Sequence, residues 1–316
     1  MIRTGTAALL AAVVLAGCGA DGPTTPPRPT TTAPQTRASL QSINGPTAPE
    51  IGPLPLAVQL ATGPTPVHPN FTTRPRGGVL FDLDTGRVLW QQHPTRVLPI
   101  ASLTKMMTAL LVVEHLPPSA RVLITRAARH AAGSKVGVLP FHKHIRLETM
   151  LYGLLLPSGN DAAVALAQRV SGTQKKFIAL MNQRAQQLNL SCTHFMSPSG
   201  IVDDGNHSCA VDLAALARAM LDEPRLAKIV KTEKAVLKFP IKGGKLYLYN
   251  NNPLLRTGYP GTIGVKTGYT DAAGHSLVGA AQRGGHRLGV VLLHSPNIGK
   301  QARVLLDRGF AALGVR

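Results

Sequence analysis

The sequence is poor in the residues on which several protein classes depend. Three cysteines among 316 residues exclude a disulfide-dense scaffold and a multi-cysteine zinc or iron–sulfur protein. Aromatic residues make up 4%, so few side chains are available for nucleic-acid bases to stack on. No nucleic-acid partner is therefore expected. Apolar runs stay shorter than the about 18 residues of a spanning helix, which excludes a polytopic membrane protein.

Acidic residues are also scarce. The chain has 15 Asp and Glu against 34 Lys and Arg, which gives a net charge of +19. These cations are scattered rather than arranged in a stripe, and this favours an anionic surface, such as a membrane face or an acidic wall polymer, as the partner. A basic, solvated surface with no specific partner is the alternative. Hydrophobic residues still make up 44%, which is enough for a core and excludes a fully disordered chain.

The first 17 residues have the pattern of an export signal. Arg3 precedes a ten-residue apolar stretch, residues 7–16, which is too short to span a bilayer. It ends in Leu15-Ala16-Gly17-Cys18, which resembles a bacterial lipobox. We therefore expect cleavage before Cys18 and a lipid anchor on that residue, on the extracytoplasmic face of the cell membrane. An ordinary signal peptide with an incidental cysteine is the alternative.

Residues 18–76 are predicted to form a tether. Thirteen of the 25 prolines fall between Gly19 and Arg76, and the few apolar residues show no sustained period. A Pro/Thr-rich segment of this kind is typical of a semi-extended linker. The domain that follows is expected to occupy residues 77–316.

The pattern of residues 77–316 predicts an α+β fold. Apolar runs on both sides of Asp84-Thr85-Gly86 predict a hairpin over residues 78–92. Further strands are expected at 235–249, 262–267, 276–283 and 286–294, and helices at 102–114, 147–156, 161–171, 174–189, 210–221 and 300–313. Strands at both ends with helices between them indicate one antiparallel sheet that carries helices on its faces.

Ser102 and Lys105 form the first candidate catalytic pair. They lie three residues apart at a helix start, so the hydroxyl and the amine share a helix face. A serine needs a base to become a nucleophile, and a lysine serves as one only when it is neutral. Its pKa must then fall by roughly 3 units from about 10.4. A buried site with a second cation nearby lowers the pKa in this way.

Two further motifs follow Ser102 and Lys105 along the chain, and the order of all three is informative. Ser158-Gly159-Asn160 lies at a predicted helix–helix turn, and Lys266-Thr267-Gly268 lies on a predicted strand. Taken alone, the first is an ordinary turn and the second an ordinary strand end. The succession S-x-x-K, S-x-N and K-T-G is typical of penicillin-recognising serine enzymes. Their joint occurrence favours the catalytic interpretation.

The chain resembles a known family over essentially all of residues 77–316. The motifs lie within LPIASLTKMMTALLV, LYGLLLPSGNDAAVALA and GVKTGYTDAAGHSLVGAA. These segments are similar to those of serine-type D-alanyl-D-alanine carboxypeptidases, the low-molecular-mass penicillin-binding proteins. The resemblance implies a β-lactamase/DD-peptidase-like fold, in which helices flank an antiparallel sheet and the site lies in a groove between the sheet and an all-helical subdomain.

The resemblance also implies an activity. The enzyme would remove the terminal D-alanine from peptidoglycan stem pentapeptides, which limits the donors for cross-linking and so affects cell shape. The same serine would be acylated by penicillins and other β-lactams as inhibitors. The reaction would need no metal and no cofactor. His142 and His144 are not expected to bind a metal, because no carboxylate or cysteine ligand accompanies them.

Residue roles follow from the same resemblance. Ser102 would be the acylated nucleophile, Lys105 its base, and Ser158 the donor of a proton to the leaving D-alanine. The substrate-binding residues would be Asn160, Lys266, Thr267, Gly268 and Tyr269.

The individual binding roles differ. Asn160 would bind the acyl-side amide, Lys266 would keep the local potential positive, and Thr267 would bind the terminal carboxylate. The backbone N–H groups of Ser102 and Tyr269 would form the oxyanion hole. Lys300 and Arg303 are both candidates for a further cation at the carboxylate.

Two other functions compete with this interpretation. A class A β-lactamase would need a deacylating glutamate, and Glu223-Pro224-Arg225-Leu226-Ala227 is similar to its loop. This segment lies 65 residues after Ser158, too far along the chain, and directly follows a predicted helix. A non-catalytic penicillin-binding or wall-binding protein would have lost Ser102, Lys105 or Lys266, and all three are present.

Cys192 and Cys209 are predicted to form a disulfide if the protein is exported. They are 17 residues apart and flank a loop with several turn signals. In an oxidising compartment such thiols tend to pair. Two free buried thiols are the alternative.

Overall fold

The computed structural model describes residues 56–315. The predicted signal peptide, the lipidated Cys18 and most of the predicted tether lie outside the described residues. Among the helices in the described part, none combines the length and the apolar character needed to cross a bilayer.

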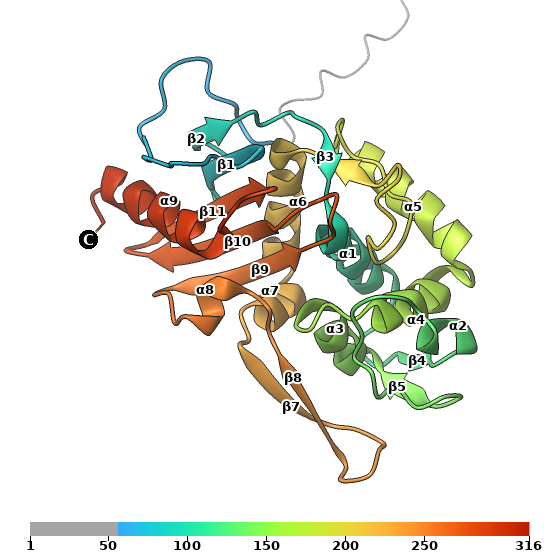
Figure 1. Cartoon of the computed structure of the whole chain (residues 1–316). Helices are drawn as coiled ribbons and strands as arrows, with labels where there is room; N and C mark the ends of the chain where they lie inside the picture. Colours follow the sequence, from blue (N-terminus) through green and yellow to red (C-terminus); the bar gives the residue numbers. More distant parts are fainter. Residues whose placement is uncertain (1–55, 316) are drawn as a thin grey trace, which may run out of the picture. The chain divides into compact units, whose positions relative to one another are not determined.

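Five strands form an antiparallel sheet (Figure 1). They are β1 (Gly77–Asp82), β2 (Val88–Gln92), β9 (Thr262–Gly268), β10 (Ser276–Arg283) and β11 (His286–Leu293). Their order is β2-β1-β11-β10-β9, so the first strand pairs with the last in the middle of the sheet. The predicted hairpin over 78–92 and the three C-terminal strands are confirmed.

The two faces of the sheet are covered by different helices. Helix α9 (Ile298–Ala312) packs on β10 and β11, and α6 (Ala210–Asp222) packs on β1 and β11. Alternate residues of a strand point to opposite faces. Accordingly, Val79 and Phe81 of β1 belong to the core cluster that contains α6, whereas Leu80 belongs to the cluster that contains α9. The α+β prediction is confirmed.

The chain between β2 and β9 builds a helical region beside the sheet. Its helices, apart from α6, are the short η1 (Ala101–Thr104), α1 (Lys105–His115), α2 (Arg126–Arg129), α3 (Leu147–Leu155), α4 (Asn160–Ser171), α5 (Gln174–Gln187), α7 (Pro224–Val230) and α8 (Pro253–Arg256). Residues 105–112 of α1 are all buried, because α1 packs against α3, α4 and α6. A helix that is apolar on every side is expected in such a central position.

An all-helical subdomain was predicted here, but this region also contains strands. Three two-stranded ribbons accompany the helices: β3 (Leu98–Pro99) with β6 (His207–Ser208), β4 (Arg121–Leu123) with β5 (His144–Arg146), and β7 (Lys234–Lys238) with β8 (Lys245–Tyr249). The first two have strands of only two or three residues, too short to leave a periodic pattern in the sequence.

The predicted boundary between tether and domain at residue 77 is wrong. Residues 56–76 pack on the domain: Val58 and Val67 are buried in its two core clusters, and Phe71 meets Trp90 edge to face with ring centroids 6.2 Å apart. Each of these apolar side chains packs separately against a surface that other elements form. The segment therefore shows no apolar period of its own, and its prolines dominate the sequence pattern.

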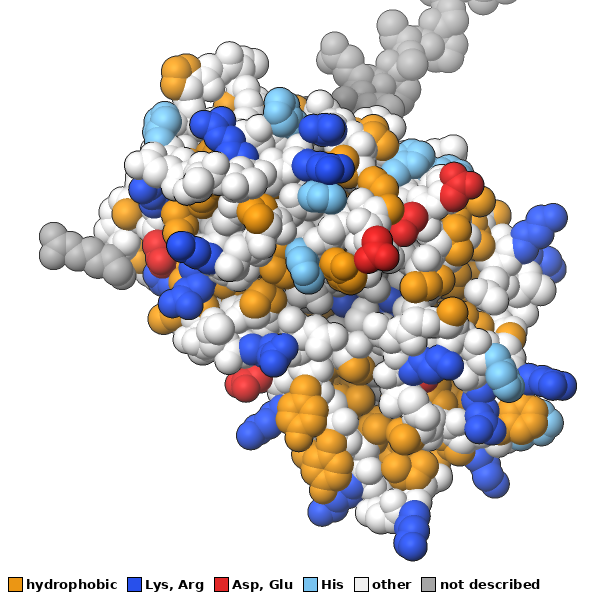
Figure 2. Space-filling view, in the orientation of Figure 1, with side chains coloured by type: hydrophobic (Ala, Val, Ile, Leu, Met, Phe, Trp, Pro, Cys, Tyr) orange, Lys and Arg blue, Asp and Glu red, His pale blue; other side chains and the backbone are white. Residues whose placement is uncertain are grey.

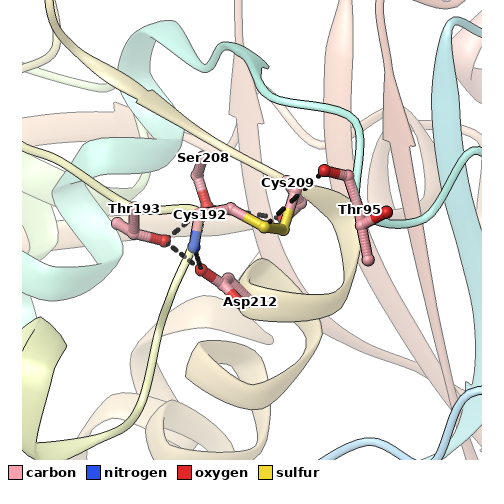
Figure 3. The surroundings of a disulfide bond; sticks show 6 residues. All are labelled: Thr95, Cys192, Thr193, Ser208, Cys209 and Asp212. Atoms are coloured by element: carbon pink, nitrogen blue, oxygen red, sulfur yellow. Dashed lines mark hydrogen bonds between the residues drawn. A yellow bond between two sulfur atoms is a disulfide. The ribbon is translucent and has the colours of Figure 1, made fainter.

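The structure joins Cys192 and Cys209 in a disulfide, with Cα atoms 5.6 Å apart (Figure 3). One carboxylate oxygen of Asp212 accepts hydrogen bonds from the Cys192 backbone N–H and the Thr193 hydroxyl, both at 2.7 Å. Burial raises the pKa of Asp212, against the opposing effect of these two donors. Since Cys209 is the N-cap residue of α6, the disulfide ties the loop over residues 192–209 to the start of that helix.

Replacing both cysteines by serine is expected to lower the free energy of unfolding by about 3 kcal/mol, because the unfolded chain regains the freedom of a loop of this size. Urea unfolding of the oxidised parent, the reduced parent and the double variant measures the effect. The reduced parent should match the variant, and equal midpoints for all three would show that the disulfide contributes nothing.

Candidate active site

The backbone around Ser102 is held from two sides. Ser102 lies in η1 just before α1, and Ala101 before it has a positive φ of 46°. A Cβ on Gly200 would lie 1.9 Å from the carbonyl oxygen of Ala101, and a Cβ on Gly268 would lie 2.8 Å from that of Ile100. Only glycine allows both approaches. The loop of Gly200 and strand β9 therefore fix the turn that carries the hydroxyl.

Lys105 is fully buried and contacts that hydroxyl. Its Nζ lies 2.8 Å from Ser102 Oγ, 2.7 Å from Asn160 Oδ1 and 2.6 Å from the carbonyl oxygen of Ser199. The last two atoms only accept hydrogen bonds, so they take two of the amine's protons. The remaining tetrahedral direction of the nitrogen faces the Ser102 hydroxyl. This arrangement suits a neutral amine, whose lone pair accepts the serine proton.

The electrostatics favour the same protonation state. Burial, and then the nearby positive charge of Lys266, hold the pKa of Lys105 well below its ordinary value, against an opposing effect of Asp161. A buried site and a second cation are the two causes that a neutral Lys105 was expected to need. The pair Ser102–Lys105 is therefore able to act as nucleophile and general base.

Asn160 is oriented by its own contacts. Its Nδ2 donates to the carbonyl oxygen of Ala132 at 2.6 Å, which leaves Oδ1 to accept from Lys105. The neighbouring Asp161 accepts from the backbone N–H groups of Val136 at 2.9 Å and Gly137 at 3.0 Å. Asp161 thereby fastens the loop over residues 132–137 beside the site.

Neither Asp161 nor Ser134, a residue of this loop that lines the cavity at Ser102, was predicted from the sequence. An acidic residue in the first turn of a helix is a weak signal for a structural role. It could have pointed to Asp161, but no sequence signal indicates Ser134.

Ser158 occupies a strained turn at the same cavity. Its φ is 66°, and its Oγ is buried without a hydrogen-bond partner among the described residues. Asn251 supports the turn, because its backbone N–H donates to Leu156 O at 3.1 Å and its side chain donates to Pro157 O at 3.3 Å. A buried hydroxyl with no partner in the protein is available to a bound molecule.

The third motif lies on β9, at the edge of the sheet next to η1. Lys266 is buried, and its Nζ donates to the carbonyl oxygen of Thr267 at 2.9 Å. Burial lowers the pKa of Lys266 to about 7. Thr267, Gly268 and Tyr269 line the cavity together with Ser102 and Ser158. All three predicted motifs thus meet at one site.

The cavity has a volume of about 940 Å³ and is rich in cations. Lys300 and Arg303 of α9, which the sequence analysis left as alternatives, both line it. Arg256 of α8 is a third cation there, which sequence reasoning missed because α8 is only four residues long. An anionic group bound in this cavity would be attracted by several positive side chains.

The Glu-Pro segment does not supply a carboxylate to this cavity. Glu223 is the N-cap residue of α7, and its side chain accepts from the backbone N–H of Arg225 at 3.1 Å. It does not line either cavity at Ser102. The segment both ends α6 and begins α7, a helix that the sequence analysis did not predict.

Comparison with known sequences gives a consistent result. A family model described as "D-alanyl-D-alanine carboxypeptidase", the S11 peptidases, matches residues 65–297. The D-alanyl-D-alanine carboxypeptidase DacF of Bacillus subtilis is 35% identical over 75% of this chain and 62% of its own length. DacB2 of Mycobacterium tuberculosis, with the same description, is 38% identical over 74% of this chain and 81% of its own. The chain thus spans less than two thirds of the Bacillus protein.

Solved structures agree with this picture. The DD-transpeptidase of Streptomyces K15 superposes with a TM-score of 0.72 at 33% identity, over 77% of this chain and all of the other. A D-alanyl-D-alanine carboxypeptidase from Mycobacterium tuberculosis H37Rv superposes with a TM-score of 0.71 at 35% identity, over 77% and 94% of the two chains.

Proposed function

Since the chain belongs to the S11 family of D-alanyl-D-alanine carboxypeptidases, we propose that it removes the terminal D-alanine from peptidoglycan stem pentapeptides. The observation that carries this proposal is the buried contact of 2.8 Å between Lys105 Nζ and Ser102 Oγ. The test is D-alanine release from a pentapeptide ending in D-Ala-D-Ala.

Acylation begins with proton transfer from Ser102 to Lys105. As the Nζ lone pair accepts the proton, Oγ attacks the scissile carbonyl carbon and an oxygen–carbon bond forms. Asn160 and Ser199 hold Nζ during the transfer. The backbone N–H groups of Ser102 and Tyr269 would stabilise the oxyanion, each by about 3 kcal/mol.

Collapse of the tetrahedral intermediate expels D-alanine. The carbon–nitrogen bond breaks as the Ser158 hydroxyl, which has no partner among the described residues, donates a proton to the leaving nitrogen and the Lys105 ammonium returns one to Ser158 Oγ. Lys105 is then neutral again. Water attacks the acyl-enzyme while Lys105 takes its proton, and Lys105 gives that proton to Ser102 Oγ as the acyl–oxygen bond breaks, which frees the shortened peptide and regenerates Ser102. A β-lactam would acylate the same oxygen and act as an inhibitor.

Substrate binding depends on the cations of the cavity. The terminal carboxylate of the pentapeptide would meet Thr267 and the positive charge of Lys266. Lys300, Arg303 and Arg256 line the same cavity and add to the attraction.

We expect a bell-shaped pH dependence of kcat/KM. Activity should fall as the pH drops and Lys105 becomes protonated, because the base is then lost. It should also fall as the pH rises through about 7, since the pKa of Lys266 is about 7 and the neutral amine no longer attracts the carboxylate. Titrating kcat/KM for pentapeptide cleavage measures both limbs.

The variant Lys266→Arg tests whether deprotonation of Lys266 causes the alkaline limb of the pH profile. A guanidinium stays charged throughout this range, so the alkaline limb should disappear while the acidic limb remains. An alkaline limb that persists unchanged in the variant would rule out Lys266 as its origin.

We also propose that the enzyme works outside the cytoplasm on a lipid anchor at Cys18. The signal-like residues 1–17 and the lipobox-like tetrapeptide support this localisation. A tether from Cys18 to the folded domain would let the domain reach the wall from the membrane.

Metabolic labelling with a fatty acid tests the anchor. The full-length chain expressed in a bacterial host should take up the label, and Cys18→Ala should not, because the thiol is the attachment point. A parent chain that stays unlabelled while it is exported would contradict lipidation.

A further inference from the structure

The β7–β8 ribbon exposes one of its two faces. Leu246 and Leu248 of β8 are buried in the main core, whereas Tyr247 and Tyr249 are 57% and 63% exposed. Val236, opposite Tyr247 on β7, is 55% exposed. Large exposed apolar groups gathered on one face mark interaction sites more often than isolated ones. Figure 2 shows hydrophobic side chains gathered over this ribbon.

The same face carries positive charge. Lys234 lies opposite Tyr249, and Lys238 lies opposite Lys245, all of them exposed. Neither strand contains an acidic residue. Residues two apart on a strand are about 7 Å from each other. The exposed face is therefore a pair of tyrosine rings, Tyr247 and Tyr249, with ammonium groups at its margins.

The exposed face continues into the active-site cavity. Asn251 and Arg256 line the cavity at Ser102, and they also line a smaller cavity of about 340 Å³ together with Tyr249. Asn251 is in turn hydrogen-bonded to Pro157, the residue before Ser158. The two cavities therefore share Asn251 and Arg256, and Tyr249 is the member of the tyrosine pair that lines the smaller one, beside Glu233.

We propose that the exposed face of β7–β8 binds the amino-sugar strand from which the stem peptide hangs. This inference rests on the proposed function and names a second part of its substrate. Sugar rings present C–H faces that pack on an aromatic ring, while the tyrosine hydroxyls remain free for hydrogen bonds. The lysines at the margins are placed to pair with carboxylates of neighbouring stem peptides.

A lipid surface fits the observations less well. Tyrosine and lysine also suit a bilayer interface, but a bilayer cannot enter the cavity at Ser102. The continuity through Asn251 and Arg256 favours an occupant that reaches from the ribbon into the catalytic groove.

The test compares two substrates with the full chain. One is a free pentapeptide ending in D-Ala-D-Ala, and the other is a soluble glycan strand that carries the same peptide. For Tyr247→Ala/Tyr249→Ala, the ratio of kcat/KM for the glycan-linked substrate to that for the free one should fall about tenfold, the effect of losing two stacking contacts. The fall should reside in KM.

Two control variants sharpen the comparison. Tyr247→Phe/Tyr249→Phe keeps both rings and should keep the ratio within about twofold. Phe141→Ala removes another exposed aromatic side chain, from the loop before β5, and should leave the ratio unchanged. Thermal unfolding shows whether each variant is folded.

The outcomes separate this inference from the proposed function. An unchanged ratio in the double alanine variant overturns the inference, even though D-alanine release from the free peptide still supports the carboxypeptidase. A parent chain inactive on the free peptide contradicts the proposed function itself. Loss of binding to phosphatidylglycerol vesicles in the double variant, with the ratio unchanged, would assign the face to a membrane and also overturn the inference.

Discussion

Replacing Ser102 by alanine is expected to lower kcat for D-alanine release by at least about 10⁴-fold, because removing the nucleophile leaves only binding and oxyanion stabilisation. In the structure, Ser102 Oγ is the hydroxyl in contact with Lys105 Nζ. Ser158 is not expected to replace it, since its Oγ makes no hydrogen bond to a base within residues 56–315. Steady-state D-alanine release and the mass of the penicillin-treated protein measure the loss.

Ser171→Ala is the matched control for this prediction. Ser171 is the last residue of α4, at the opposite end of the helix from Asn160, so its removal should leave both readouts at parental values. If Ser102→Ala retained more than a few per cent of the activity, or still gained the mass of one penicillin, another residue would be the nucleophile.

The second large effect is expected at Lys105. Lys105→Met keeps the length of the side chain and removes the base, so acylation should slow by about 10³-fold or more. Lys105→Arg keeps a positive charge but cannot become neutral near pH 7. If the amine acts as a base, both variants should fail alike. The rate of penicillin acylation under single-turnover conditions measures this step alone.

The control for Lys105 is Lys175→Met. Lys175 lies exposed on α5, and its replacement should leave the acylation rate unchanged. Lys105→Met leaves Asn160 Oδ1 and Ser199 O without their buried donor, and Lys105→Arg places a larger group in the same buried space. Thermal unfolding shows whether both variants still fold. A Lys105→Arg variant that acylates at the parental rate would show that Lys105 acts through its charge and not as a base.

The candidate pair Ser102–Lys105 was predictable because the proposed chemistry depends on a short spacing. Ser102 and Lys105 share a face of one helical turn, so three residues of sequence were enough to pair them. The meeting of these residues with Ser158 and Lys266 does not follow from spacing. It was inferred from the order of the motifs, and the cavity shows it directly.

What the sequence analysis missed depends on contacts between distant residues. Asp161 follows a recognised motif, yet its role comes from the N–H groups of Val136 and Gly137, 25 and 24 residues earlier. Residues 56–76 carry a linker-like composition, but Val58 and Val67 find places in cores built by other elements. No local pattern encodes either fact.

The β7–β8 ribbon was predictable only in part from the sequence. The alternation in Lys245-Leu246-Tyr247-Leu248-Tyr249 predicts a strand with one buried face. It does not tell whether the tyrosines or the leucines face the core. The structure buries the leucines, and this choice creates the exposed tyrosine pair.

One measurement tests the central claim most directly. The purified chain is mixed with a pentapeptide ending in D-Ala-D-Ala, and D-alanine and tetrapeptide are quantified over time, with and without prior treatment by penicillin. We expect equal amounts of both products, and no release once one penicillin per chain is bound to Ser102. No D-alanine release, together with continuous hydrolysis of penicillin, would contradict the account and indicate a β-lactamase.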